Sequence, residues 1–300
     1  AIYTMWGGVP AYWERLDQDL SVMENLQRQL MPYQSWMIDE SRTLLQDFIT
    51  EPHNYVAVLR AIADGLQSLG EISKRAGLSG THTSFYLSIL RDAGFVQRQV
   101  PISQLDQEDS RRGRYFVVDP FLRFYYRFLA AFQSKLALGQ QQQTIHAIEE
   151  ALPQFIEANT WRELSRNWLL EASANGEFPL SVENVGSEWK RNFMVDVVGL
   201  DKESKSIVLG DCFWREEPAG LESIQELVRK TRTALPYNDE WNVYYVIFSA
   251  SGWTTEAEEK AQSIIEEVAA SGKRRSWRPV GIRLVNLKTL DEDLYRWAIG

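Results

Sequence analysis

Residues 52–119 carry the most informative pattern in this chain. Three short helical patterns, NYVAVLRAIADG, LGEISKRAG and THTSFYLSILRDAG, are followed by two strand patterns, FVQRQVPI and RGRYFVVD, with the polar loop SQLDQEDSR between them. The second and third helices are joined by Ala76, Gly77 and Leu78. The small side chain of Ala76 lets the two helices approach, Gly77 allows the bend, and Leu78 packs into the core. This order predicts a helix-turn-helix followed by a wing.

The third of these helices is the one that enters the major groove when such a motif reads DNA. Its first turn contains Thr81, His82 and Thr83, which are suited to contact phosphates or base edges. The basic residues that we expect at the phosphates come from the preceding helix and the wing; they are Lys74, Arg75, Arg98 and Arg112. Double-stranded DNA is therefore a candidate partner, and the alternative is a winged fold that only separates or joins proteins.

Two acidic residues stand inside apolar strand patterns nearer the C-terminus. The stretch MVDVVGLDKESKSIVLGDCFWR reads as two strands and a turn, with Asp196 in the first strand and Asp211 in the second. A carboxylate in a half-buried strand costs free energy unless it is hydrogen-bonded, paired or bound to a metal. Neighbouring antiparallel strands would bring the two acids together and, with Glu163 from the preceding helix, would form an oxygen shell suited to Mg²⁺. In the alternative interpretation the acids are structural: Asp196 hydrogen-bonds the end of the sheet, and Asp211 pairs with Arg215 or with a lysine of the next helix.

The other patterns complete an α plus α/β chain. The first 50 residues read as helices, in PAYWERLDQDLSVMENLQRQLM and DESRTLLQDFI. Another helix, PFLRFYYRFLAAFQSKLALG, leads to the polar run GQQQQT, which is a linker or an exposed helix start. The remaining patterns are a helix, three strands, a helix, a strand, a helix and a strand, and this order predicts a mixed sheet flanked by helices. We predict four parts: a helical segment at 1–50, a winged helix-turn-helix domain at 51–120, a connecting helix and linker at 121–144, and a sheet domain at 145–300.

Charge and cysteine content exclude several classes of protein. The net charge of −9 argues against coating of nucleic acid by bulk electrostatics, so any DNA contact must be local. The single cysteine, Cys212, excludes an intrachain disulfide framework and zinc sites built on several thiolates, and it fits a reducing compartment. No apolar run approaches the length of a membrane span, so we expect a soluble cytoplasmic protein with no membrane partner.

Several segments resemble a known family in the same order. They are GGVPAYWERL, AGLSGTHTSFYLSILRDAGFVQRQVPI, RYFVVDPFLRFYYRF and the strand pair around Asp196 and Asp211. The chain resembles the C-terminal part of archaeal-type P-loop ATPases that also occur in bacteria, in which an AAA-type ATPase module precedes a winged helix and a nuclease-like domain of unknown function. The resemblance implies that residues 1–50 are the helical lid of the ATPase module. It also implies that the last domain is restriction-endonuclease-like, with the PD-(D/E)xK core of a helix, a three-strand meander, a helix and a strand.

Two departures from that family pattern bear on function. The nucleotide-binding signature G-x-x-x-x-G-K-[ST] is absent, so ATP would bind only through a domain upstream of this chain. The family pattern also places a lysine two residues after the second acid, where this chain has Phe213, which offers no charge to a developing phosphorane. Arg215 and Lys230 are the candidate replacement cations, although an arginine is too basic to serve as a general base.

These observations lead to one preferred function and two alternatives. We expect the DNA- or partner-sensing C-terminal region of an ATP-binding ATPase family protein, in which Glu163, Asp196 and Asp211 are the remnant of an inactive nuclease site. The first alternative is a metal-dependent DNA nuclease that holds Mg²⁺ between Asp196 and Asp211. The second is a regulatory or oligomerisation scaffold that binds a protein partner or a second copy of itself.

Overall fold

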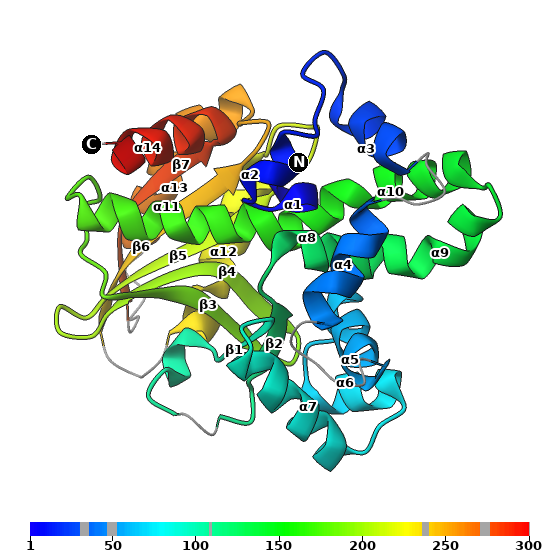
Figure 1. The fold of residues 1–300 in the computed structure, drawn as a ribbon. Coiled ribbons are helices and arrows are strands. Elements are labelled where there is room, and N and C mark those ends of the chain that lie inside the picture. Colours follow the sequence, from blue (N-terminus) through cyan, green and yellow to red (C-terminus); the bar gives the residue numbers. More distant parts are fainter. Residues whose placement is uncertain (31–35, 47–52, 108–109, 236–239, 271–276, 300) are drawn as a thin grey trace. The chain divides into compact units, whose positions relative to one another are not determined.

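The computed structural model describes residues 1–30, 36–46, 53–107, 110–235, 240–270 and 277–299 of the chain, and it confirms the predicted α plus α/β class (Figure 1). Two compact units are present: Ala1–Val100 with Asp109–Leu152, and Pro101–Glu108 with Pro153–Gly300. The boundary predicted at residue 50 lies outside the described residues. The boundary predicted at residue 144 falls inside helix α10 (Gln141–Ile156), whereas the two units part near the end of that helix.

The N-terminal helices of the first unit are shorter than predicted. They are α1 (Ile2–Trp6), α2 (Pro10–Trp13), α3 (Val22–Leu30) and α4 (Trp36–Gln46). The helical pattern over residues 10–30 is therefore interrupted between α2 and α3. Asn25 explains the break, because its side-chain amide donates to the carbonyls of Asp17, Leu20 and Ser21 at 2.9–3.1 Å. Ser21 and Glu24 then start α3 with a capping box, which satisfies two main-chain N–H groups.

The predicted helix-turn-helix and wing are present in the first unit. The elements are α5 (His53–Ala63), α6 (Leu69–Ala76), α7 (Gly80–Asp92), β1 (Val96–Gln99) and β2 (Arg114–Val117), and the two strands pair antiparallel. Ser68 and Glu71 form a capping box at the start of α6, and Gly77 ends that helix in the left-handed conformation at φ 69°. The Ser79 hydroxyl then accepts the His82 N–H and starts α7. Local capping signals therefore fix both sides of the turn.

An aromatic helix follows the wing. It consists of α8 (Pro120–Phe124), a π-helical stretch (Tyr125–Leu129) and α9 (Ala130–Ala137), and its aromatic side chains in the first two segments are buried. The run GQQQQT leads directly into α10, so it forms a helix start rather than a linker. No helix in the described part of the chain is long and apolar enough to cross a membrane.

The second unit is built on a five-stranded sheet. In chain order its elements are a π-helical stretch (Glu157–Trp161), α11 (Arg162–Ala174), β3 (Asn184–Lys190), β4 (Phe193–Asp201), β5 (Ser206–Phe213), α12 (Leu221–Ala234), β6 (Trp241–Ser249), α13 (Thr255–Ala270), β7 (Trp277–Asn286) and α14 (Leu287–Ile299). The strand order is β3-β4-β5-β6-β7; β3, β4 and β5 are antiparallel, and β5, β6 and β7 are parallel. The predicted order of helix, meander, helix, strand, helix and strand is confirmed, and α14 is an additional helix.

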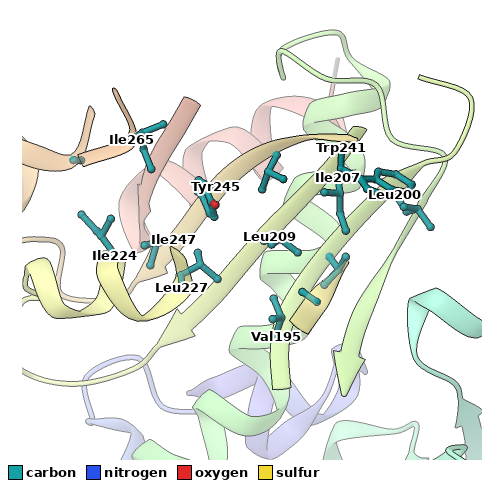
Figure 2. Packing of buried hydrophobic residues seen from close by; sticks show 14 of the residues in the cluster. Val195, Leu200, Ile207, Leu209, Ile224, Leu227, Trp241, Tyr245, Ile247 and Ile265 are labelled. Atoms are coloured by element: carbon teal, nitrogen blue, oxygen red, sulfur yellow. The ribbon is translucent and has the colours of Figure 1, made fainter. Parts of the chain in front are cut away.

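Helices cover both faces of this sheet. On one face, Leu209 and Ile247 pack with Ile224 and Leu227 of α12 and with Ile265 of α13 (Figure 2). On the other face, Trp168 of α11 meets the ring of Phe248 at 5.6 Å. Because successive residues of a strand point to opposite faces, α11 and α12 lie on opposite sides of β5 and β6.

Candidate functional site

A β-bulge determines where Asp196 points. The pairing of β3 with β4 shifts register between Gly186 and Glu188, so that Ser187 alone lies opposite both Asp196 and Val197. The Ser187 hydroxyl donates to the main-chain carbonyl of Asp196 at 2.7 Å. An extra residue in one strand interrupts the alternation of side chains between the two faces. Asp196 therefore turns toward the α11 side of the sheet.

The Asp196 carboxylate is buried and paired on that side. Only 7% of the residue is exposed, and its Oδ1 lies 2.8 Å from Nε of Arg162 on α11. Its Oδ2 accepts the main-chain N–H of Cys212 at 3.1 Å. Arg166 stands one turn further along α11, and burial lowers the pKa of its guanidinium. The first two turns of α11 thus hold two cations beside the acid.

Asp211 is paired from the opposite face. It belongs to the same alternating series as Leu209, and Nζ of Lys230 on α12 lies 2.6 Å from its Oδ2. The residue is 3% exposed, and its Oδ1 is buried without a hydrogen-bond partner. Burial, followed by the negative charge of Asp196, raises the pKa of Asp211 to about 6 despite the opposing effect of Lys230. The ionised carboxylate at neutral pH therefore depends on its lysine.

The two acids lie on neighbouring strands, but their carboxylates point to opposite faces of the sheet and each is buried in its own ion pair. No group of three or more His, Cys, Asp or Glu residues in the described part of the chain is arranged to hold a metal ion, so Glu163 completes no such group with Asp196 and Asp211. Of the two candidate cations, Lys230 is at Asp211, whereas the exposed guanidinium of Arg215 stacks over Phe213 at 4.9 Å. The geometry matches the structural interpretation of the acids.

Sequence reasoning missed Arg162 as the partner of Asp196. The available signal was the spacing of Arg162 and Arg166, which places two cations on one face of the helix that precedes the acidic strands. Glu157 was also missed: its Oε2 accepts the N–H of Trp214 at 2.9 Å, just beyond the end of β5. Both contacts join the region before β3 to the end of the strand pair.

The helix-turn-helix exposes part of the predicted DNA surface. Thr81 and His82 are exposed in the first turn of α7, as predicted for DNA contacts. Thr83 is fully buried, and its hydroxyl donates to the Ser79 carbonyl at 2.9 Å, so it is wrongly placed as a DNA contact. The other exposed side chains of α7 are Ser84, Phe85, Ser88, Arg91 and Asp92.

The predicted basic residues differ in how free they are to reach DNA. Lys74 and Arg75 are both exposed on α6, although Arg75 donates to Asp64 at 3.0 Å. Arg98 is half-buried, and its guanidinium donates to the main-chain carbonyl of Ser110 at 2.6 Å. It fills the space beside Gly113, where an added Cβ would require the guanidinium to shift. Arg98 therefore holds the wing loop together.

Arg112 also takes part in the structure of the wing loop. Its main-chain N–H donates to the Ser110 hydroxyl at 3.2 Å, and its side chain is half-exposed. This contact involves the main chain only, so contact of the Arg112 guanidinium with a phosphate stays a prediction. Among the four basic residues, those of α6 are the most accessible.

Most of the polar loop of the predicted wing belongs to the second unit. Ile102 is buried in the core of that unit, and the Ser103 N–H donates to the fully buried carboxylate of Glu188 at 3.1 Å. Asp106 forms a salt bridge with Lys202. The strands of the wing and the loop between them thus belong to different units.

Two family models match parts of the chain. Residues 55–98, from α5 to β1, match the family described as bacterial regulatory protein, arsR family. Residues 125–227 match the family described as archaea bacterial proteins of unknown function, and this range includes both acidic strands. The chain thus contains a winged helix-turn-helix region followed by a region similar to a family of unknown function.

One curated relative extends over most of the chain. An uncharacterized protein of Methanocaldococcus jannaschii is 26% identical over 248 residues, which make up 82% of this chain and 54% of the relative. The chain therefore spans about half the length of that relative. No solved structure matches the chain.

Proposed function

We propose that this chain binds duplex DNA through its helix-turn-helix and forms the sensing region of a longer ATP-binding protein. The observation that carries the proposal is the outward-facing first turn of α7, directly after a turn fixed by Gly77 and Ser79. In this motif the second helix lies in the major groove and its N-terminal residues contact base edges, while the first helix crosses the backbone. The match to the arsR family over residues 55–98 supports the assignment.

The charges suit a local contact rather than a broad one. Lys74 is exposed on α6, and Arg111 is exposed in the wing loop. The N-terminus of α7 adds the partial positive charge of the helix dipole, which favours phosphate. Since the whole chain carries a net charge of −9, we expect few phosphate contacts and a small dependence of affinity on salt.

A salt titration tests the proposal. Fluorescence anisotropy with a labelled random-sequence duplex should show binding that weakens as NaCl rises. Lys74→Ala should weaken binding several-fold and lower the slope of log affinity against log salt by about 0.9, the value of one phosphate contact. Lys288→Ala removes the same charge from an exposed site on α14 and should leave binding unchanged. Equal effects of the two variants, or no binding at low salt, would refute DNA binding by this surface.

The ATP-binding part of the proposal concerns residues outside this chain. It is supported by the resemblance of the chain to the C-terminal part of P-loop ATPases and by a relative of which the match covers 54%. Because the chain lacks the phosphate-binding signature, ATP with Mg²⁺ should leave its melting temperature unchanged. An increase with ATP would show that this part of the proposal is wrong.

A metal-dependent nuclease is the second candidate, and one observation favours it. Lys230 stands 2.6 Å from Asp211, in a position to replace the cation that Phe213 cannot supply, and the Oδ1 of Asp211 has no hydrogen-bond partner. A metal at this place would have to displace Arg162 or Lys230 from a buried acid, which costs free energy. We therefore propose that the sheet domain retains the acids as structural ion pairs and does not cleave DNA.

A further inference from the structure

The recognition helix α7 exposes one large apolar side chain. Phe85 is 59% exposed, although burial of a phenyl ring is favourable. Its ring meets the ring of Tyr86 edge-on at 5.6 Å. Tyr86 in turn contacts Tyr55 at 4.7 Å, and its hydroxyl accepts a hydrogen bond from Asn54 at 2.8 Å. The residue behind Phe85 is thus fixed, and the phenyl ring points into solvent.

The residues around Phe85 define what α7 is able to read. Thr81, Phe85 and Ser88 follow one another at helical spacing on the exposed face, with His82 and Ser84 beside them. Arginine and lysine are the side chains that read guanine, and asparagine and glutamine read adenine. None of these types occurs on α7 before Arg91 in its last turn. The first turns of the helix therefore offer hydroxyl groups, an imidazole and one apolar ring.

Only one base presents an apolar group in the major groove. Thymine carries a C5-methyl group there, and phenylalanine is among the side chains that contact it. Serine and threonine hydroxyls bond to bases of either kind and so discriminate little. An exposed ring between such residues is complementary to a thymine methyl group more than to any other feature of the groove.

We propose that Phe85 contacts thymine methyl groups in the major groove and makes the chain prefer duplexes that contain A·T pairs under the second turn of α7. The inference rests on the proposed DNA binding and names the chemistry that this surface recognises. A protein partner would also cover an exposed phenyl ring. The position of Phe85 on the second helix of a helix-turn-helix, with Lys74 exposed on the first, favours DNA.

Replacement of thymine by deoxyuridine tests the proposal, because it removes the methyl group and leaves the base-pairing and hydrogen-bonding groups unchanged. Affinities are compared by anisotropy for an A·T-rich duplex and for the same duplex with deoxyuridine at every thymine. The wild-type chain should bind the deoxyuridine duplex several-fold more weakly. Phe85→Ala should bind the thymine duplex several-fold more weakly than the wild type and should no longer distinguish the two duplexes.

Leu138→Ala serves as the matched control. Leu138 is also exposed in the first unit, at 76%, but it lies just after α9 and away from α7 in the sequence. This variant should bind both duplexes as the wild type does. Melting temperatures equal to that of the wild type establish that both variants are folded, as expected for changes at exposed positions.

The outcomes separate this inference from the proposed function. Salt-dependent binding that is insensitive to deoxyuridine in the wild type would refute the role of Phe85 and leave DNA binding intact. Discrimination that persists in Phe85→Ala would do the same. Absence of salt-dependent binding to any duplex would refute both proposals. Loss of self-association in Phe85→Ala, measured by light scattering and without an effect on duplex binding, would identify the ring as a protein contact and overturn the inference.

Discussion

Lys230 Nζ lies 2.6 Å from Asp211 Oδ2, so a lysine of helix α12 neutralises an acid that is 3% exposed in strand β5. On the other face of the sheet, Arg162 pairs with Asp196 in the neighbouring strand. Each acid thus has its own cation and its own helix. The arrangement joins α11 and α12 to the end of the same strand pair by charge as well as by apolar packing.

Loss of the lysine charge should destabilise the second unit. Lys230→Met removes the charge and keeps much of the apolar stem, and it leaves the buried Asp211 carboxylate without its partner. We expect a loss of about 3 kcal/mol in the free energy of unfolding, measured in urea at neutral pH, as for other pairs broken from one side. Lys288→Met, at an exposed pair on α14, should change it by less than about 1 kcal/mol.

A double variant tests whether the uncompensated carboxylate is the cause. Adding Asp211→Asn to Lys230→Met removes the unpaired charge, and it should recover part of the lost stability. The opposite outcome is additivity, in which Asp211→Asn lowers the free energy of unfolding by the same amount in the wild type and in Lys230→Met. Additivity would show that the two residues do not interact energetically. The pairing would then have no part in stability.

The raised pKa of Asp211 predicts the direction of a pH effect. The pKa of Asp211 is about 6 in the folded chain, whereas the ordinary value for an aspartate, taken for the unfolded chain, is 3.8. Between pH 3.8 and pH 6 the folded state therefore holds a proton that the unfolded state has released. The contribution of Asp211 to the free energy of unfolding is therefore largest at or below pH 3.8 and falls as pH rises to 6. Urea unfolding of the wild type and of Asp211→Asn between pH 4 and 6 measures this contribution as a difference.

The free energy of unfolding is plotted against pH for the wild type and for Asp211→Asn, and the difference between the two curves isolates the effect of Asp211 from that of the other acids. Glu177, for example, has a pKa lowered to about 2 by hydrogen bonds from Arg296 and Trp297, and its effect on stability has the opposite sign and a lower pH range. This effect is common to both proteins and cancels. A wild-type curve parallel to that of Asp211→Asn from pH 4 to 6 would contradict the raised pKa.

The sequence predicts well what depends on neighbouring residues. The turn between α6 and α7 follows from Gly77 and the serine caps, and the order of elements in the sheet follows from apolar periodicity. Thr83 was misassigned although it stands four residues before the core residue Leu87, a spacing that places both on one face. The periodicity that indicated the helix also indicated which residues it buries.

The parts that could not be predicted depend on contacts distant in sequence. The bulge opposite Ser187 turns Asp196 toward Arg162, and no pattern within β4 indicates the extra residue. Ile102 likewise ends the strand pattern FVQRQVPI, and its burial depends on contacts in the second unit that are distant in sequence. Alternation within the strands predicts neither feature.

The paired acids predict a negative result in a cleavage assay. Because Asp196 and Asp211 are occupied by Arg162 and Lys230, we expect no cleavage of supercoiled plasmid with Mg²⁺ or Mn²⁺ above that of Asp211→Ala purified in the same way. The matched variant controls for a contaminating nuclease. Metal-dependent cutting by the wild type that Asp211→Ala abolishes would establish the nuclease alternative instead.

Anchoring of the wing loop makes Ile102 a stability residue of the second unit. Ile102→Ala removes buried apolar volume beside β3, and it should lower the free energy of unfolding by about 2–4 kcal/mol. Leu105→Ala removes a similar side chain three residues further on at an exposed position, and it should change the value by less than about 0.5 kcal/mol. Tryptophan fluorescence in a urea titration reports both. Equal and small effects would show that the loop does not contribute to the core in solution.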